Sequence, residues 1–207
     1  MHIDNYTLIV LPTSYLPNIE YFKILFDSDT VYIDGYERYE KQTFRNRTKI
    51  LTANGDLNLS IPVSRPQGKE TLVNEVEISN AEDWRKDHLK AIESAYKNTP
   101  YFEYYWDKIS TLLNDDVKAL DVFNLRLIKH ISDKIGLTVD IKETSAFYEF
   151  TENDFRKSLH PKKDSGFKAN HYIQTFEERH GFNSNPSILD LLFNEGPNSI
   201  SILQESV

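Results

Sequence analysis

The chain has 207 residues, of which 24 are Lys or Arg and 32 are Asp or Glu, so its formal net charge is −8. This acidic balance argues against a general nucleic-acid-binding protein, because phosphate backbones require positively charged surfaces. No stretch approaches the roughly 18 apolar residues of a membrane span, and the first residues lack the basic region of a signal peptide, so we expect a soluble, cytoplasmic protein without membrane insertion.

Cysteine is absent from the chain, and Met1 is its one methionine. This excludes thiol nucleophiles, disulfides and Cys-ligated metal sites. Hydrophobic residues make up 39% and charged residues 27%, which is the balance of an ordinary globular protein. We find no internal repeat and no linker rich in Pro, Gly or Ser. About 200 residues suffice for one large domain, so we expect a single domain over residues 1–207.

The first predicted elements form a strand–helix–strand unit. Residues 8–11 are a short apolar run that predicts a buried strand, halted by Pro12. Residues 17–26 carry apolar side chains at three- and four-residue spacing and predict a helix, and residues 31–33 predict a second strand. Two short strands on either side of one helix indicate a βαβ unit with parallel strands.

A β-hairpin is predicted between residues 49 and 63. Two apolar stretches there flank Asn54-Gly55, a dipeptide that supplies the two positive φ angles of a type I′ turn. Alternating apolar residues predict another strand over residues 72–78.

The middle of the chain is predicted to be helical, because apolar residues recur there with the period of a helix. The remaining elements are expected to be helices at about 80–97, 99–113 and 118–135, the last one stopped by Gly136, then a strand at 137–141, a basic loop at 155–166 and a short helix at 186–193. This order favours an α/β fold, a single domain in which a mixed, mostly parallel sheet and a β-hairpin pack against helices.

Positive charge is concentrated between Arg38 and Lys49, where five basic residues accompany one acidic residue. Arg45 and Arg47 have i,i+2 spacing, so on an extended strand they share one face, while Asn46 points the other way. Two guanidinium groups on one face can bind a phosphate or a carboxylate bidentately. The alternative is a solvated strand edge, where positive charge deters edge-to-edge pairing.

His88 follows Trp84 by four residues on a predicted helix, at the border of its apolar face. An imidazole in that place suits a general base, and a purely structural role is the alternative. One Glu-x-x-His occurs without a second copy, and neither His-Glu-x-x-His nor a Gly-rich phosphate loop is present. We therefore predict no metal site and none of the common nucleotide-binding loops.

Seven stretches of the chain, in the right order and spread over nearly its whole length, carry the pattern of a known family. They are Pro12-x-x-Tyr15-x-Pro17-x-x-x-Tyr21-Phe22, Lys41-Gln42-Thr43-Phe44-Arg45-Asn46-Arg47, Leu59-Ser60-Ile61-Pro62-Val63, Trp84-Arg85-Lys86-Asp87-His88-Leu89, Pro100-Tyr101-Phe102-Glu103-Tyr104-Tyr105, Tyr172-Ile173-Gln174-x-Phe176 and Ser187-Ile188-Leu189-Asp190-Leu191-Leu192-Phe193-Asn194-x-Gly196-Pro197. With these stretches the sequence resembles the WbqC-like protein family.

The resemblance implies a place in surface-polysaccharide biosynthesis. Members of that family tend to lie among genes for O-antigen or other surface polysaccharides, and the family has been proposed to include glycine transferases. For Asp190 a structural alternative exists, because a carboxylate in the first turn of a helix stabilises the helix dipole. The resemblance implies three groups of site residues. The anion-binding residues are Lys41, Arg45, Asn46 and Arg47, and the other substrate-binding residues are Tyr15, Gln174 and Asn194. The catalytic residues are His88 and Asp190.

The sequence departs from the family pattern at two places. Leu11 stands where many members have Gln, and a short basic loop near Lys162 replaces extra sequence that longer members carry. Both places lie where the resemblance implies that a donor or an acceptor binds.

Two hypotheses follow for the function. In the first, a soluble transferase modifies an activated sugar, such as a nucleotide sugar, by forming an amide or ester bond. Its basic residues Lys41, Arg45 and Arg47 hold the phosphates, and Tyr15 or another aromatic residue stacks on the base. His88 or Asp190 takes a proton from the attacking group. In the second, a non-catalytic binding or assembly component of polysaccharide synthesis binds the same anionic ligand. Convergence of the basic and the catalytic residues on one cleft would favour the enzyme. The sequence assigns neither a cofactor nor an oligomeric state.

Overall fold

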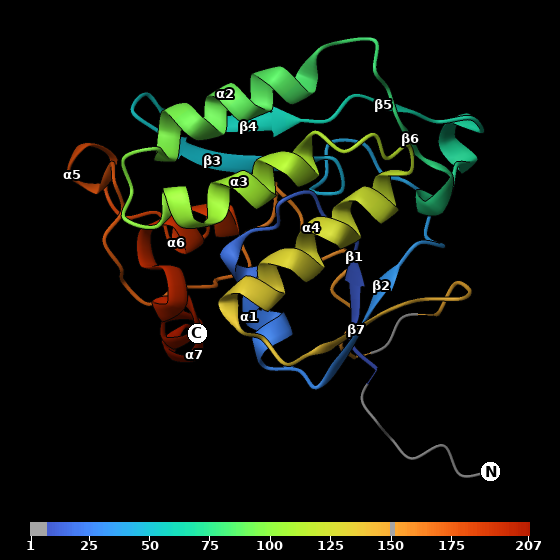
Figure 1. Ribbon diagram of the computed structural model, residues 1–207. Coiled ribbons are helices and arrows are strands. Elements are labelled where there is room, and N and C mark those ends of the chain that lie inside the picture. The colour runs from blue at the N-terminus through green and yellow to red at the C-terminus, as the bar shows by residue number, and fades with distance from the viewer. Residues whose placement is uncertain (1–7, 150–151) are drawn as a thin grey trace.

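The computed structural model describes residues 8–149 and 152–207 (Figure 1). The first elements are strand β1 (Val10–Pro12), helix α1 (Ile19–Phe26) and strand β2 (Thr30–Asp34). Strands β1 and β2 pair in parallel, so the βαβ unit predicted from the sequence is confirmed.

A third parallel strand completes this sheet. Strand β7 (Asp140–Glu143) pairs with the free edge of β2, which gives the strand order β1-β2-β7. Helix α1 connects β1 to β2 and is capped by the preceding residue, Asn18, whose side chain accepts a hydrogen bond from the backbone N–H of Tyr21 at 3.2 Å. This side-chain cap satisfies one of the N–H groups that a helix start leaves unpaired.

The predicted hairpin is present and forms a sheet of its own. Strands β3 (Arg47–Thr52) and β4 (Gly55–Ser60) pair antiparallel and do not join the parallel sheet. The predicted type I′ turn is wrong, because Gly55, with φ +96°, has a positive φ and Asn54 does not. The Thr52 hydroxyl fixes this turn instead, donating to the Gly55 carbonyl at 2.8 Å and accepting from the Asn54 N–H at 3.2 Å.

The strand predicted over residues 72–78 is mostly wrong. Within this segment only Glu77–Ile78 forms a strand, β6, and it pairs with β5 (Val63–Ser64). Before β6 the chain makes two 3₁₀ turns, η1 (Gly68–Glu70) and η2 (Val73–Glu75). The physical reason lies in Glu75, whose carboxylate accepts from the Leu72 N–H at 2.9 Å and closes the turn.

Three helices follow where their apolar periodicity predicts them. They are α2 (Trp84–Tyr96), α3 (Phe102–Leu113) and α4 (Leu120–Ile135). Gly136 ends α4 with φ +89°, as predicted, because the left-handed conformation costs a glycine little. Helix α2 lies over the β3–β4 hairpin (Figure 1).

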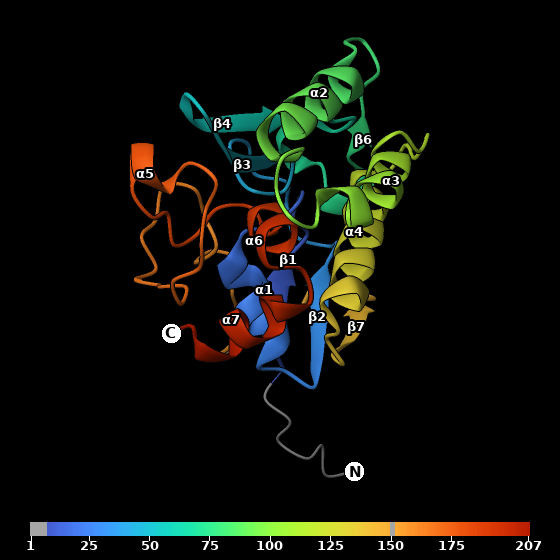
Figure 2. The same ribbon diagram turned by 60° about the vertical axis from the view of Figure 1, so that its left-hand side comes forward.

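The C-terminal part holds the short helices α5 (Glu177–His180), α6 (Ile188–Glu195) and α7 (Ser199–Glu205), with the 3₁₀ turn η3 (Gly196–Asn198) between the last two. Figure 2 shows α1 beside α6 and α7 to one side of β1 and β2, with α4 on the other side. The predicted helix at 186–193 corresponds to α6, which is capped by the Ser187 hydroxyl.

One cluster of buried apolar side chains runs through these elements and reaches from Leu11 in β1 to Leu203 in α7. The molecule therefore has the predicted α/β fold, with a parallel sheet, a β-hairpin and packed helices. In the described parts of the chain, every helix is too short or too polar to cross a membrane.

Candidate functional site

The basic segment of the sequence borders a cavity of about 660 Å³. Arg47 and Lys49 of β3 line it, and so do Lys162 and Lys163 of the loop 158–167. We call this space the basic cavity, after these four cationic side chains. The loop is about 110 residues away from β3 in the sequence, so only folding brings the two groups of cations together.

Two carboxylates also line the basic cavity, and both are hydrogen-bonded within the protein. Glu20 accepts from the side-chain amide of Asn185 at 2.9 Å, and Asp164 accepts from the Gly166 N–H at 2.9 Å. The cations outnumber the carboxylates, so the cavity favours an anionic occupant.

Arg47 is the first residue of β3, and its side chain is half-buried. Its Nε is buried and has no hydrogen-bond partner among the described residues. A buried donor without a partner costs about 1–3 kcal/mol, so an acceptor placed in the cavity would recover that free energy. Lys49 lies two residues further along the strand, on the same face, and pairs with Asp56 at 2.9 Å.

The loop 158–167 adds an imidazole to the cavity wall. His160 lines the cavity, and its Nδ1 accepts from the backbone N–H of Lys162 at 3.1 Å. In the neutral ring the proton is therefore on Nε2, which can donate to a ligand. The sequence predicted a basic loop here, and the family resemblance implied that a donor or an acceptor binds near Lys162. His160 and Lys163 were not among the predicted site residues, and the run of basic residues was the available signal.

Arg45 lies away from this cavity. Its guanidinium group pairs with the Glu37 carboxylate through Nε at 2.9 Å and NH2 at 2.6 Å, and the side chain is 3% exposed. The predicted common strand face of Arg45 and Arg47 is wrong, because β3 begins only at Arg47 and Arg45 lies in a turn before it, where the Arg47 N–H donates to the Phe44 carbonyl at 3.4 Å. Burial raises the pKa of Glu37, and the neighbouring Arg45 opposes this shift.

Lys41 and Asn46 have different surroundings. Lys41 is exposed and does not belong to the lining of the basic cavity. Asn46 is buried, and its side-chain amide donates to the Ile61 carbonyl at 2.7 Å while the Ile61 N–H donates to the Asn46 carbonyl at 2.8 Å. Asn46 thus attaches the turn before β3 to the end of β4.

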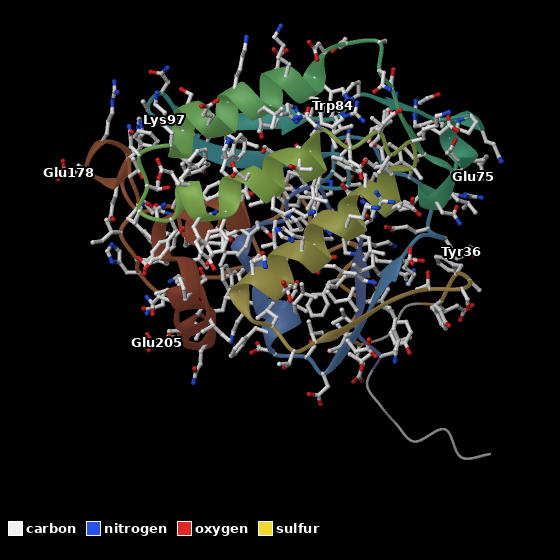
Figure 3. All side chains as sticks on the ribbon, in the orientation of Figure 1. Tyr36, Glu75, Trp84, Lys97, Glu178 and Glu205 are labelled. Atoms are coloured by element: carbon white, nitrogen blue, oxygen red, sulfur yellow. The ribbon has the colours of Figure 1, made fainter. Side chains whose placement is uncertain are left out.

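Tyr15 and His88 meet in the core. The Tyr15 hydroxyl lies 2.9 Å from His88 Nδ1, and Tyr15 is 0% exposed, so neither face of its ring is open to a ligand. Trp84, labelled on α2 in Figure 3, stands edge-on to both rings. Burial lowers the pKa of His88 to about 4, partly opposed by a hydrogen bond to the Ser60 backbone. His88 is therefore a neutral, enclosed imidazole at neutral pH.

Asp190 lies in a second buried polar cluster. Its Oδ1 accepts from the Tyr172 hydroxyl at 2.7 Å and from the Gln174 amide at 3.1 Å. Burial raises the pKa of Asp190 to about 6, although hydrogen bonds from Tyr172, Tyr96 and Gln174 oppose the shift. Asn194 lies next to this cluster and donates to the Asp190 carbonyl at 2.8 Å. The carboxylate is enclosed by protein donors.

A second cavity of about 420 Å³ lies beside this cluster, and Gln174 is part of its wall. Asn183 and Ser184 line both this second cavity and the basic cavity. The two cavities are therefore neighbours along β3.

The predicted site residues do not converge on one cleft. Arg47 lines the basic cavity and Gln174 lines the second cavity, whereas Tyr15, His88 and Asp190 are buried behind other side chains. Over residues 8–149 and 152–207, no three His, Asp or Glu side chains are grouped so that they could hold a metal ion.

Comparisons with known proteins identify a family. The model of the WbqC-like protein family matches residues 13–180. The chain is also similar to the uncharacterized protein Rv1507c of Mycobacterium tuberculosis, with 25% identity over 221 residues that cover 90% of this chain and 93% of that protein. No solved structure matches the chain.

Proposed function

We propose that this chain, which belongs to the WbqC-like protein family, binds an activated sugar such as a nucleotide sugar in the basic cavity and takes part in surface-polysaccharide biosynthesis. The observation that carries the proposal is Arg47, a cation on the cavity wall whose buried Nε has no partner among the described residues. The pathway comes from the family resemblance, and the ligand class comes from the charge of the cavity.

The chemistry of the cavity supports a phosphorylated ligand. Guanidinium and ammonium groups form short, charge-assisted hydrogen bonds with phosphate oxygens, which are about twice as strong as neutral ones. A volume of about 660 Å³ lies within the usual range of small-molecule sites. Amide side chains such as those of Asn58 and Asn183 add neutral groups that can select among ligands.

Titration calorimetry with UDP, GDP and dTDP and with their hexose conjugates tests the proposal. We expect at least one of these nucleotides to bind, and we expect Arg47→Ala to weaken its binding by about 10- to 100-fold, because a hydrogen bond to a charged group contributes about 1.5–3 kcal/mol. The matched control is Arg126→Ala, which removes an exposed guanidinium on α4 that pairs with Asp115. Binding that is unchanged in Arg47→Ala, or the absence of binding by all these nucleotides, would contradict the proposal.

Group transfer is a second candidate function, favoured by His160 in the cavity wall. In amide or ester formation from a glycyl thioester, an amine or hydroxyl of the sugar attacks the acyl carbon and the carbonyl oxygen gains negative charge. The C–S bond then breaks, and the thiolate leaves with the proton that the attacking group gives up. The Nε2–H of His160 can donate to that oxygen and stabilise it. In this candidate function His160 contacts the reacting group directly. His88 and Asp190 remain proposed site residues, and they lie behind other side chains.

Turnover separates the two candidates. The nucleotide sugar that binds is incubated with a glycyl thioester, and the products are followed by mass spectrometry. Acylated sugar, with a lower kcat in His160→Ala and an unchanged KM, supports the transferase. Binding without any product supports the non-catalytic component.

A further inference from the structure

The second cavity continues the basic cavity along the hairpin. Strand β3 lines both, with Arg47 and Lys49 on the basic cavity and Leu51 and Thr52 on the second one. At a rise of about 3.3 Å per residue, Arg47 and Thr52 are about 16 Å apart. An elongated ligand can therefore occupy both cavities while it follows one strand.

The two cavities differ in their chemistry. The second cavity has the half-buried ring of Phe176 and the carboxylate of Asp56 in its wall. Asp56 Oδ2 pairs with Lys49 at 2.9 Å, and its Oδ1 lies 3.4 Å from the side-chain amide nitrogen of Asn183. Each carboxylate oxygen has a second lone pair, so Asp56 can accept further hydrogen bonds from hydroxyl groups.

These groups disfavour a phosphate in the second cavity, because the Asp56 carboxylate would repel it. An aromatic ring beside a carboxylate and an amide suits a neutral ring with many hydroxyl groups. The C–H face of such a ring packs on the aromatic ring, and its hydroxyl groups bond to the polar side chains.

Hydrogen bonds from buried side chains hold part of the wall of the second cavity in place. Gln174 donates to the Asn183 carbonyl at 2.8 Å and accepts from the Asn183 N–H at 2.9 Å. Gln174 is in turn bonded to the buried pair of Tyr172 and Asp190. This network holds Asn183 in place before a ligand arrives, which reduces the entropy cost of binding.

We infer that the second cavity is the subsite for the sugar ring of the ligand, with Phe176 packing on the ring and Asp56 accepting its hydroxyl groups, while the nucleotide occupies the basic cavity. The inference rests on the proposed function, since it assumes that the basic cavity holds the phosphates. It assigns the Tyr-x-Gln-x-Phe segment to positioning the sugar: Phe176 touches the ring and Gln174 acts through Asn183.

Paired titrations of UDP and UDP-glucose test the inference, or the corresponding GDP and dTDP pairs where those bind better. We expect Phe176→Ala to weaken UDP-glucose binding by about tenfold and to leave UDP binding unchanged, since truncation of a well-packed aromatic contact costs more than 1 kcal/mol. Asp56→Asn is a second variant that keeps the shape of the side chain. Because it also releases Lys49, which lines the basic cavity, its readout is the ratio of UDP-glucose affinity to UDP affinity, and this ratio is expected to fall. Tyr104→Ala, which removes a 78%-exposed ring on α3, is the matched control and is expected to change neither affinity.

The outcomes distinguish this inference from the proposed function. Loss of UDP-glucose affinity with UDP binding retained supports the subsite, and retained UDP binding also shows that the variant is folded. Equal effects on UDP and UDP-glucose, or no effect on either, overturn the subsite and leave nucleotide binding in the basic cavity intact. If none of the nucleoside diphosphates binds the wild-type protein, the proposed function fails and the subsite fails with it.

Discussion

Arg45 and Arg47 lie two residues apart, and their guanidinium groups have different surroundings. Arg45 is buried against Glu37 with two short contacts, whereas Arg47 reaches the basic cavity with a buried Nε that lacks a partner among the described residues. A buried ion pair with good geometry holds the fold in place, and a guanidinium group on a cavity wall whose Nε has no partner among the described residues can form a further hydrogen bond.

We expect Arg45→Met to lower the free energy of unfolding by about 3 kcal/mol, because it leaves the Glu37 carboxyl buried without its partner. Urea unfolding measures the change. The double variant with Glu37→Leu is expected to recover most of the loss, since replacement of both charges removes the unpaired group. A single variant as stable as the wild type would show that the pair does not stabilise the fold.

At the residue scale, the sequence indicated which side chains are unusual, and it did not indicate where they point. The concentration of positive charge around Arg47 is visible in the sequence, but the turn over residues 44–47, in which the Arg47 N–H donates to the Phe44 carbonyl and Arg45 is turned away from Arg47, is not. His88 sits at the border of a helix face in the sequence pattern. Whether such a histidine meets solvent or another ring depends on the partner from a distant element, here Tyr15.

Among the elements, the junction between α6 and η3 is tightly constrained. Gly196 has φ +53°, and a Cβ at this position would lie 2.5 Å from the ring of Tyr101. The backbone N–H of Tyr101 also donates to the Phe193 carbonyl at 3.0 Å. Only a glycine accommodates both the positive φ and the close approach of this ring.

Gly196→Ala is therefore expected to destabilise the protein more than Gly136→Ala. Both glycines have a positive φ, so each substitution costs about 1–2 kcal/mol in backbone strain. A Cβ at Gly136 meets open space, whereas at Gly196 it overlaps the Tyr101 ring, which adds about 1–3 kcal/mol of overpacking. Thermal unfolding of the two variants gives the comparison, and equal losses would contradict the role of Tyr101.

The elements that the sequence predicted well are those with a sustained period. Helices α2, α3 and α4 each repeat apolar residues over three or more turns, and Gly136 gives a clear stop. The predicted strand at 72–78 rested on alternation over only a few residues, and the hydrogen bond from the Leu72 N–H to the Glu75 carboxylate stabilises a 3₁₀ turn there instead. No helix was predicted after residue 193, so α7 was missed. Pro197 lies in the first turn of η3, directly before α7, in a position where a proline can begin a helical segment.

Across the whole molecule, His88 and Asp190 are buried groups whose pKa values move in opposite directions. Burial lowers the pKa of His88 from 6.5 to about 4 and raises that of Asp190 from 3.8 to about 6. Both shifts come from the same cause, because burial disfavours the charged form of either group. Their effects on stability therefore depend oppositely on pH.

The folded state keeps Asp190 protonated between about pH 4 and pH 6, where the unfolded chain has released that proton. The stability from Asp190 is thus present below its unfolded pKa of 3.8 and is lost as pH rises through about 6, by about 3 kcal/mol. The stability from His88 is present above its unfolded pKa of 6.5 and is lost as pH falls towards 4, by a similar amount.

We expect the pH dependence of stability that each group contributes to show in the difference in unfolding free energy between its variant and the wild type. Relative to the wild type, Asp190→Asn gains stability as pH rises from about 4 to about 7, and His88→Gln gains stability as pH falls over the same range. Urea unfolding at several pH values measures both. Parallel curves for a variant and the wild type would show that the replaced group does not titrate in this way.

The candidate site is a property of the whole molecule. Its walls come from the start of α1, from the hairpin and from the loop 158–167 together with residues 183–185. Segments this far apart in the sequence share no local pattern, so no spacing rule connects Arg47 to Lys162. The sequence predicted the fold class and the family because both rest on patterns within elements, and the cavity depends on contacts between them.

The hydrogen bond from the Leu51 N–H to the buried Tyr96 hydroxyl, at 3.2 Å, connects β3 to the polar cluster around Asp190. An amide proton held by a side chain in the interior exchanges with solvent only when that side chain moves away. Hydrogen exchange at this one position is therefore an intrinsic spectroscopic probe. The probe lies on β3, the strand that borders both cavities, and its exchange rate reports on the buried hydrogen-bond network around Asp190. No label has to be introduced.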